Sequence, residues 1–135
     1  MFVNEASDYE AGRAAQRAYI QAWFDELITL LNTRKVREFK GQAIPFTNIE
    51  VIKNPDSGSA DVTADVVIDD KVTFHVYFSI RDNGYSNDDP KYVGEVSLSS
   101  NVKKGFFSKR GTGKNSKPAY LFELLSNMFN LKYHR

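Results

Sequence analysis

The chain contains no cysteine among its 135 residues. This absence excludes disulfide bonds and any zinc or iron–sulfur site built on thiolates. No apolar run approaches the roughly 20 residues that a membrane-spanning helix needs, and the polar, acidic start of the chain, Met1 to Glu10, does not resemble a secretory signal. We therefore expect a cytoplasmic protein with no membrane partner, no metal and no cofactor.

Little else in the composition is unusual. Hydrophobic residues make up 41% of the chain and charged residues 26%, as in globular domains and unlike disordered segments. A chain of 135 residues has the length of one domain, and such a domain buries roughly two thirds of the surface of its unfolded chain. No repeat, low-complexity tract or linker interrupts it. The sequence therefore predicts a single domain over residues 1–135.

Acidic residues are almost missing from the last part of the chain. Residues 1–95 hold 10 basic and 16 acidic side chains, a net charge of −6. Residues 96–135 hold 8 basic side chains and one acid, Glu123, a net charge of +7. The small overall charge of +1 hides this division. A basic segment of this kind indicates contact with an anionic partner.

One long helix is expected near the N-terminus. Tyr19, Trp23 and Leu27 belong to an apolar stripe with the spacing of three and four residues that a helix requires. The pattern Ser7–Glu10 is typical of a capping box at a helix start. The stripe is interrupted after Thr33, where we expect the helix to end.

A second helix is expected at the C-terminus. It is apolar on most sides and should begin near Pro118, with Asn115 or Ser116 as its cap. Residues 34–42, by contrast, fit neither a helix nor a strand clearly.

Four segments alternate apolar and polar residues, which predicts β-strands. These segments cover approximately residues 46–53, 61–68, 72–81 and 92–100. A three-residue loop, Asp69–Lys71, places Ile68 opposite Val72 and keeps all apolar residues of the central hairpin on one face. The same register places Asp65 opposite His75 on the polar face.

These elements predict an α+β fold of two layers. A four-stranded antiparallel meander carries the N-terminal and C-terminal helices on one face, in the order α-β-β-β-β-α. The helices cover the apolar face of the sheet, and the polar face stays in contact with water.

Residues 103–117, which we expect to form a loop, are the main candidate for a binding site. The segment holds six basic side chains, three glycines and no acid. Basic side chains neutralise phosphates, glycine lets a backbone approach a ligand closely, and phenylalanine rings stack on bases. The candidate residues for binding nucleic acid or another anion are Lys103, Lys104, Phe106, Phe107, Lys109, Arg110, Lys114 and Lys117. The leading hypothesis is a non-catalytic nucleic-acid-binding protein that uses this segment.

The main alternative is a protein-interaction or inhibitor module, of the type found among small accessory proteins of phages and mobile elements. The basic segment would then dock on an acidic surface of a target protein, or the acidic sheet face would mimic nucleic acid. A homo-oligomer is a further expectation, because the long first helix can expose apolar area. A nucleotide-binding P-loop is excluded, because the spacing around Gly111 and Gly113 does not fit G-x-x-x-x-G-K.

No catalytic residue is expected. His75 and Asp65 form the only acid–base pair that the predicted register brings together, and a carboxylate beside a histidine can orient a general base. Exposed cross-strand pairs of this kind usually stabilise the sheet instead. We therefore expect that the protein is not an enzyme.

Overall fold

The computed structural model describes residues 5–33, 35–39, 42–68, 72–82, 92–101 and 106–133. Two α-helices frame the described chain, α1 (Glu5–Thr33) and α2 (Pro118–Tyr133). Between them lie β1 (Lys35–Phe39), β2 (Gln42–Pro45), β3 (Thr47–Lys53), β4 (Ser59–Ile68), β5 (Val72–Asp82), β6 (Tyr92–Ser100) and β7 (Phe106–Thr112). Two short 3-10 helices complete the list, η1 (Pro55–Ser57) and η2 (Gly113–Ser116).

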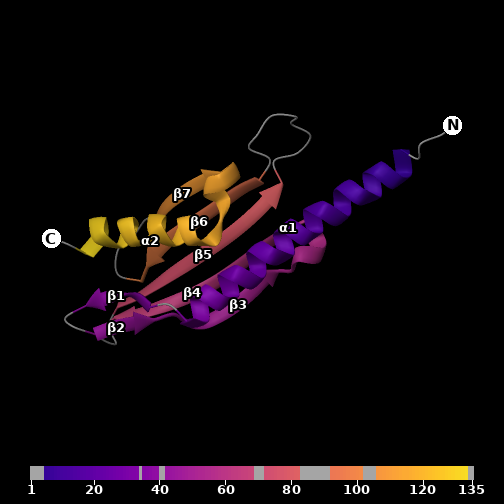
Figure 1. Ribbon diagram of the computed structural model, residues 1–135. Helices are drawn as coiled ribbons and strands as arrows, with labels where there is room; N and C mark the ends of the chain where they lie inside the picture. Colours follow the sequence, from indigo (N-terminus) through magenta and orange to yellow (C-terminus); the bar gives the residue numbers. More distant parts are fainter. Residues whose placement is uncertain are drawn as a thin grey trace.

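The main sheet is antiparallel and has five strands in the order β3-β4-β5-β6-β7, so each strand pairs with its neighbours in the sequence (Figure 1). The short strands β1 and β2 form a separate two-stranded sheet. The predicted α+β class and the antiparallel meander are confirmed. The predicted strand number of four is too low by one, because residues 106–112 form β7 and not part of a loop.

Strand β7 is difficult to recognise in the sequence because it lies at the edge of the sheet. Lys109 pairs with the buried Val96, at a position that an inner strand would fill with an apolar residue. At the edge this side chain reaches solvent, and lysine on an edge strand also discourages pairing with other chains. The apolar alternation by which strands are identified is therefore missing here.

The predicted register of the central hairpin is confirmed. Ile68 pairs with Val72, and Asp65 pairs with His75. A shift by one residue would turn every apolar side chain of β4 toward solvent, so burial of this face alone determines the register.

Both helices cover the same face of the sheet, as predicted (Figure 1). Buried apolar side chains from sheet and helices form one core, which includes Ile20, Leu27, Val62, Val76, Phe78, Leu98, Leu121 and Leu125. The ring of Phe122 on α2 lies 5.3 Å from that of Phe78 on β5 and 5.5 Å from that of Phe46, which precedes β3. These contacts fix α2 on the sheet.

Helix α1 ends at Thr33, as predicted, but its start differs from the prediction. Its described part begins at Glu5, so the backbone of Ser7 belongs to the first helical turn and does not precede the helix. The N-terminal part of α1 projects beyond the sheet (Figure 1). Within the described residues, no helix is long and apolar enough to cross a membrane.

Candidate binding face of the sheet

Strand β7 separates two cations that the sequence analysis placed in one loop. Arg110 pairs with Glu95 of β6, and Lys109 pairs with Val96. Since Val96 belongs to the core, Lys109 lies on the helix side of the strand, while Arg110 lies on the polar side. Both side chains are exposed. The prediction that residues 103–117 form one loop is therefore wrong, because successive residues of a strand point to opposite faces.

Arg110 is engaged by an acid of its own sheet. Its Nε donates a hydrogen bond to Oε2 of Glu95 over 2.8 Å, and the Oγ of Ser97 donates to Oε1 of the same carboxylate over 3.3 Å. An exposed pair of this kind stabilises a fold by about 1 kcal/mol or less. Its larger effect is to reduce the charge that Arg110 offers to an external phosphate.

The other predicted anion-binding residues are placed in different parts of the fold. Lys117 is exposed and directly precedes α2. The backbones of Phe106 and Phe107 belong to β7, opposite Ser99 and Leu98. Lys114 belongs to η2, and the side chains of Phe106, Phe107 and Lys114 lie outside the described part of the structure. Lys103 and Lys104 also lie outside the described residues.

The glycines of this region serve the fold. A Cβ at Gly111 would overlap the backbone carbonyl of Asn115, and a Cβ at Gly94 would lie 2.6 Å from the carbonyl oxygen of Ser116. Glycine at both positions lets η2 pack against the end of the sheet. Close approach to a ligand is therefore not needed to explain why Gly111 is a glycine.

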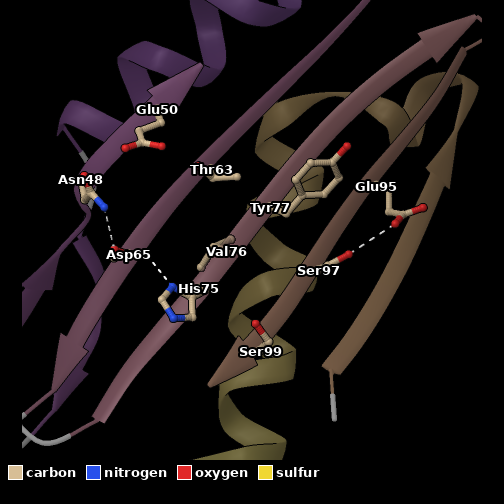
Figure 2. Close-up of a pocket in the computed structure, with 10 residues that line it drawn as sticks. All are labelled: Asn48, Glu50, Thr63, Asp65, His75, Val76, Tyr77, Glu95, Ser97 and Ser99. Carbon is tan, nitrogen blue, oxygen red and sulfur yellow. Dashed lines mark hydrogen bonds and ion pairs between the residues drawn. The ribbon is translucent and has the colours of Figure 1, made fainter. Parts of the chain in front are cut away.

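A hollow of about 610 Å³ opens on the polar face, across β3 to β6 (Figure 2). It is lined by Asn48, Glu50, Thr63, Asp65, His75, Val76, Tyr77, Glu95, Ser97 and Ser99. Apart from Val76, which belongs to the core, the lining residues occupy alternate positions of their strands, which place their side chains on one face. Helices cover only the opposite face, so the hollow is open to solvent.

The carboxylate of Asp65 is held from two sides. Its Oδ1 lies 2.7 Å from Nδ1 of His75, and its Oδ2 accepts a hydrogen bond of 3.0 Å from Nδ2 of Asn48 (Figure 2). Asn48 has a φ of 52°, in the left-handed region that asparagine tolerates better than most residues. It lies where the β3–β4 register shifts, and this backbone conformation accompanies the amide contact with Asp65.

Tyr77 lies on β5, between Thr63 of β4 and Ser97 of β6. Burial, together with a hydrogen bond to Asp61 and the negative charge of Asp61, raises the pKa of its hydroxyl to about 12. The group is therefore protonated at neutral pH and remains a hydrogen-bond donor. Its ring gives the hollow an aromatic surface beside the polar side chains.

The hollow has a definite electrostatic character. Glu50, Asp65 and Glu95 line it, together with hydroxyl groups, and no lysine or arginine is among the ten lining residues. Carboxylates fixed at known positions bind guanidinium and ammonium groups through charge-assisted hydrogen bonds. Among the described residues, no group of three or more histidine, aspartate or glutamate side chains could hold a metal ion. The arrangement thus fits a cationic group that donates hydrogen bonds.

The sequence predicts Asp65 and His75 on the polar face, but it does not predict a hollow there. The alternation of polar residues in β6 could have indicated this site, since Glu95, Ser97 and Ser99 are every second residue of the strand and lie on one face. The contribution of Asn48 could not be anticipated, because its contact depends on an irregularity in the strand pairing. Comparison with known proteins finds no matching family model, no similar curated protein and no similar solved structure.

Proposed function

We propose that the protein is a non-catalytic interaction module that binds a basic segment of a target protein on the polar face of its sheet. The observation that carries the proposal is the hollow across β3 to β6, with three carboxylates and neither lysine nor arginine in its lining. A face of this character resembles the negative surface of a nucleic acid, so the target would itself be a protein with a basic site.

Preorganisation supports this function. Asp65 is held by Asn48 and His75, and Glu95 by Ser97 and Arg110. A ligand that binds carboxylates already fixed on strands loses less entropy than one that must first order flexible side chains. Complementary charge would speed association with a basic segment and exclude acidic competitors.

The test is a fluorescence anisotropy titration with a labelled oligoarginine peptide, repeated at several salt concentrations. We expect binding that weakens as salt rises, because the interacting charges are exposed. Asp65→Asn removes one negative charge from the hollow while keeping the side-chain shape. It should weaken binding by roughly threefold to tenfold, the range of a single partly exposed charge pair.

The matched control is Asp56→Asn, which makes the same change at an exposed residue of η1, outside the hollow. It should leave peptide affinity almost unchanged at moderate salt. Equal effects of the two substitutions would mean that the peptide responds only to net charge, and the proposed site would be rejected.

A second candidate is the nucleic-acid function expected from the sequence. Lys109 favours it, because this exposed side chain lies on the helix side of β7, away from the acids of the polar face. Its test uses duplex DNA, single-stranded DNA and duplex RNA in the same titration, with Lys109→Glu as the variant. Binding of any of the three that Lys109→Glu abolishes, without binding of oligoarginine, would favour this candidate over the first.

A further inference from the structure

Strand β3 ends the sheet and exposes apolar side chains. Its only neighbour in the main sheet, as far as the structure describes the chain, is β4. Val51 and Ile52 of β3 are 44% and 56% exposed. Terminal strands with exposed apolar residues tend to pair with a further strand, because their outer edge offers unsatisfied backbone hydrogen-bonding groups.

A register shift in β3 arranges four consecutive residues in an unusual way. Glu50 pairs with Thr63 and Val51 with Val62, whereas Lys53 pairs with Asp61, so β3 has one residue more than β4 over this stretch. The extra residue brings Glu50 and Lys53 opposite Thr63 and Asp61, two positions of the polar face. Val51 and Ile52 lie between the two charged residues.

The order acid, two apolar residues, base in residues 50–53 is complementary to itself when two copies of the strand run antiparallel. A two-fold axis between Val51 and Ile52 would run β3 antiparallel to β3 of a second copy. Glu50 would then lie opposite Lys53 of the second copy at both ends of the contact, with the four apolar side chains between. Neither Glu50 nor Lys53 has a salt bridge among the described residues. Opposite charges directly across an antiparallel pair stabilise the pairing, and an isologous contact of this kind closes as a dimer.

We propose that β3 is a dimerisation edge, at which two copies of this chain join their sheets into one antiparallel sheet of ten strands. Backbone hydrogen bonds between the two β3 strands would hold the copies together, as in other cases of strand addition. The bulge and the two charges would set the register. The inference does not depend on the proposed ligand of the polar face.

The test is sedimentation equilibrium over roughly a hundredfold range of protein concentration, since the dimer fraction follows mass action. We expect a monomer–dimer equilibrium in the unmodified chain. Lys53→Glu places a carboxylate opposite Glu50 at both ends of the contact and should raise the dimer dissociation constant roughly tenfold or more. The double exchange Glu50→Lys with Lys53→Glu recreates opposite charges and should restore the original dissociation constant.

A second pair of variants distinguishes pairing at this edge from nonspecific association of exposed apolar side chains. Ile52→Lys should raise the dissociation constant, whereas Val67→Lys changes an equally apolar, 41% exposed residue of the inner strand β4 and should not. Circular dichroism confirms that each variant is folded. A chain that is monomeric at every concentration would overturn the proposal. So would a dimer whose dissociation constant is unaffected by Lys53→Glu, or one that the double exchange does not rescue.

Discussion

The indole Nε1 of Trp23 on α1 donates a hydrogen bond of 2.7 Å to the backbone carbonyl oxygen of Ser116, the last residue of η2. Ser116 is fully buried. Its Oγ lies 3.0 Å from the hydroxyl of Tyr19, whose ring stacks on Tyr92 of β6 at 3.8 Å. These contacts connect the first helix, the last helix and the sheet at one point, and they explain why a polar residue is retained in the core.

Replacing Trp23 should therefore cost more than lost packing alone. Trp23→Phe keeps an aromatic ring but leaves the carbonyl oxygen of Ser116 buried without this donor, which we expect to lower the free energy of unfolding by about 1–3 kcal/mol. Urea denaturation measures the change. Thr29→Ala, which removes an exposed hydrogen bond to the backbone of Asp25 on the same helix, serves as control and should change stability by about 0.5 kcal/mol or less. Equal urea midpoints for the two variants would contradict the assigned role of Trp23.

A single methyl group at Gly111 should also destabilise the fold. Gly111→Ala would overlap the backbone carbonyl of Asn115, and a backbone atom cannot move aside as a side chain can. We expect a loss of about 2 kcal/mol or more in the free energy of unfolding. Gly58→Ala is the comparison, because nothing lies within 4 Å of its Cβ position and only the strain of a φ of 82° remains. That strain costs about 1–2 kcal/mol, so thermal unfolding of Gly111→Ala at or above the Gly58→Ala midpoint would refute the close contact.

Alkaline pH should destabilise the protein through Tyr77. The pKa of its hydroxyl is about 12 in the folded protein, above the 10.0 of an exposed tyrosine, chiefly because of burial. Between these two values the unfolded chain has lost the proton and the folded chain keeps it, so stability falls as pH rises from 10 to 12. Urea denaturation across this range measures the slope. Tyr77→Phe removes the titrating group and should make the slope shallower; an unchanged slope would contradict the raised pKa.

Alternation made the centre of the sheet predictable. In β4 and β5 every second residue is apolar, and only one register buries all of them, so the pairing of Asp65 with His75 followed from the sequence. The peripheral strands are harder to predict, because they lack this alternation. Residues 34–42 show no pattern typical of a helix or a strand, although most of them belong to β1 and β2, because a two-stranded sheet outside the main sheet needs no regular apolar face.

The candidate site was also difficult to predict, because one of its strands lacks the alternation of apolar residues. Arg110 was assigned to phosphate because its neighbours in sequence are basic, whereas its neighbour across the sheet is Glu95. That pairing becomes visible only once β7 is recognised as a strand, and Lys109 conceals the strand by placing a charge where alternation requires an apolar residue. The electrostatic environment of a strand residue is set by its cross-strand partners, so a charge count along the chain overestimates the cations available on one surface.

Arg110 consequently distinguishes the two proposed functions. Arg110→Gln releases the carboxylate of Glu95 from its cation and makes the hollow more negative, so oligoarginine should bind about twofold to fivefold more tightly. If residues 103–117 bind phosphate instead, the same substitution should weaken binding to duplex DNA and reduce the slope of log affinity against log salt by about 1. Both effects can be measured by anisotropy, with Arg17→Gln on the exposed side of α1 as the control for net charge.

Tighter peptide binding in Arg110→Gln but not in Arg17→Gln would support the polar face as the binding surface. Weaker DNA binding confined to Arg110→Gln would instead assign the function to the basic segment, because only there does the guanidinium itself contact the ligand.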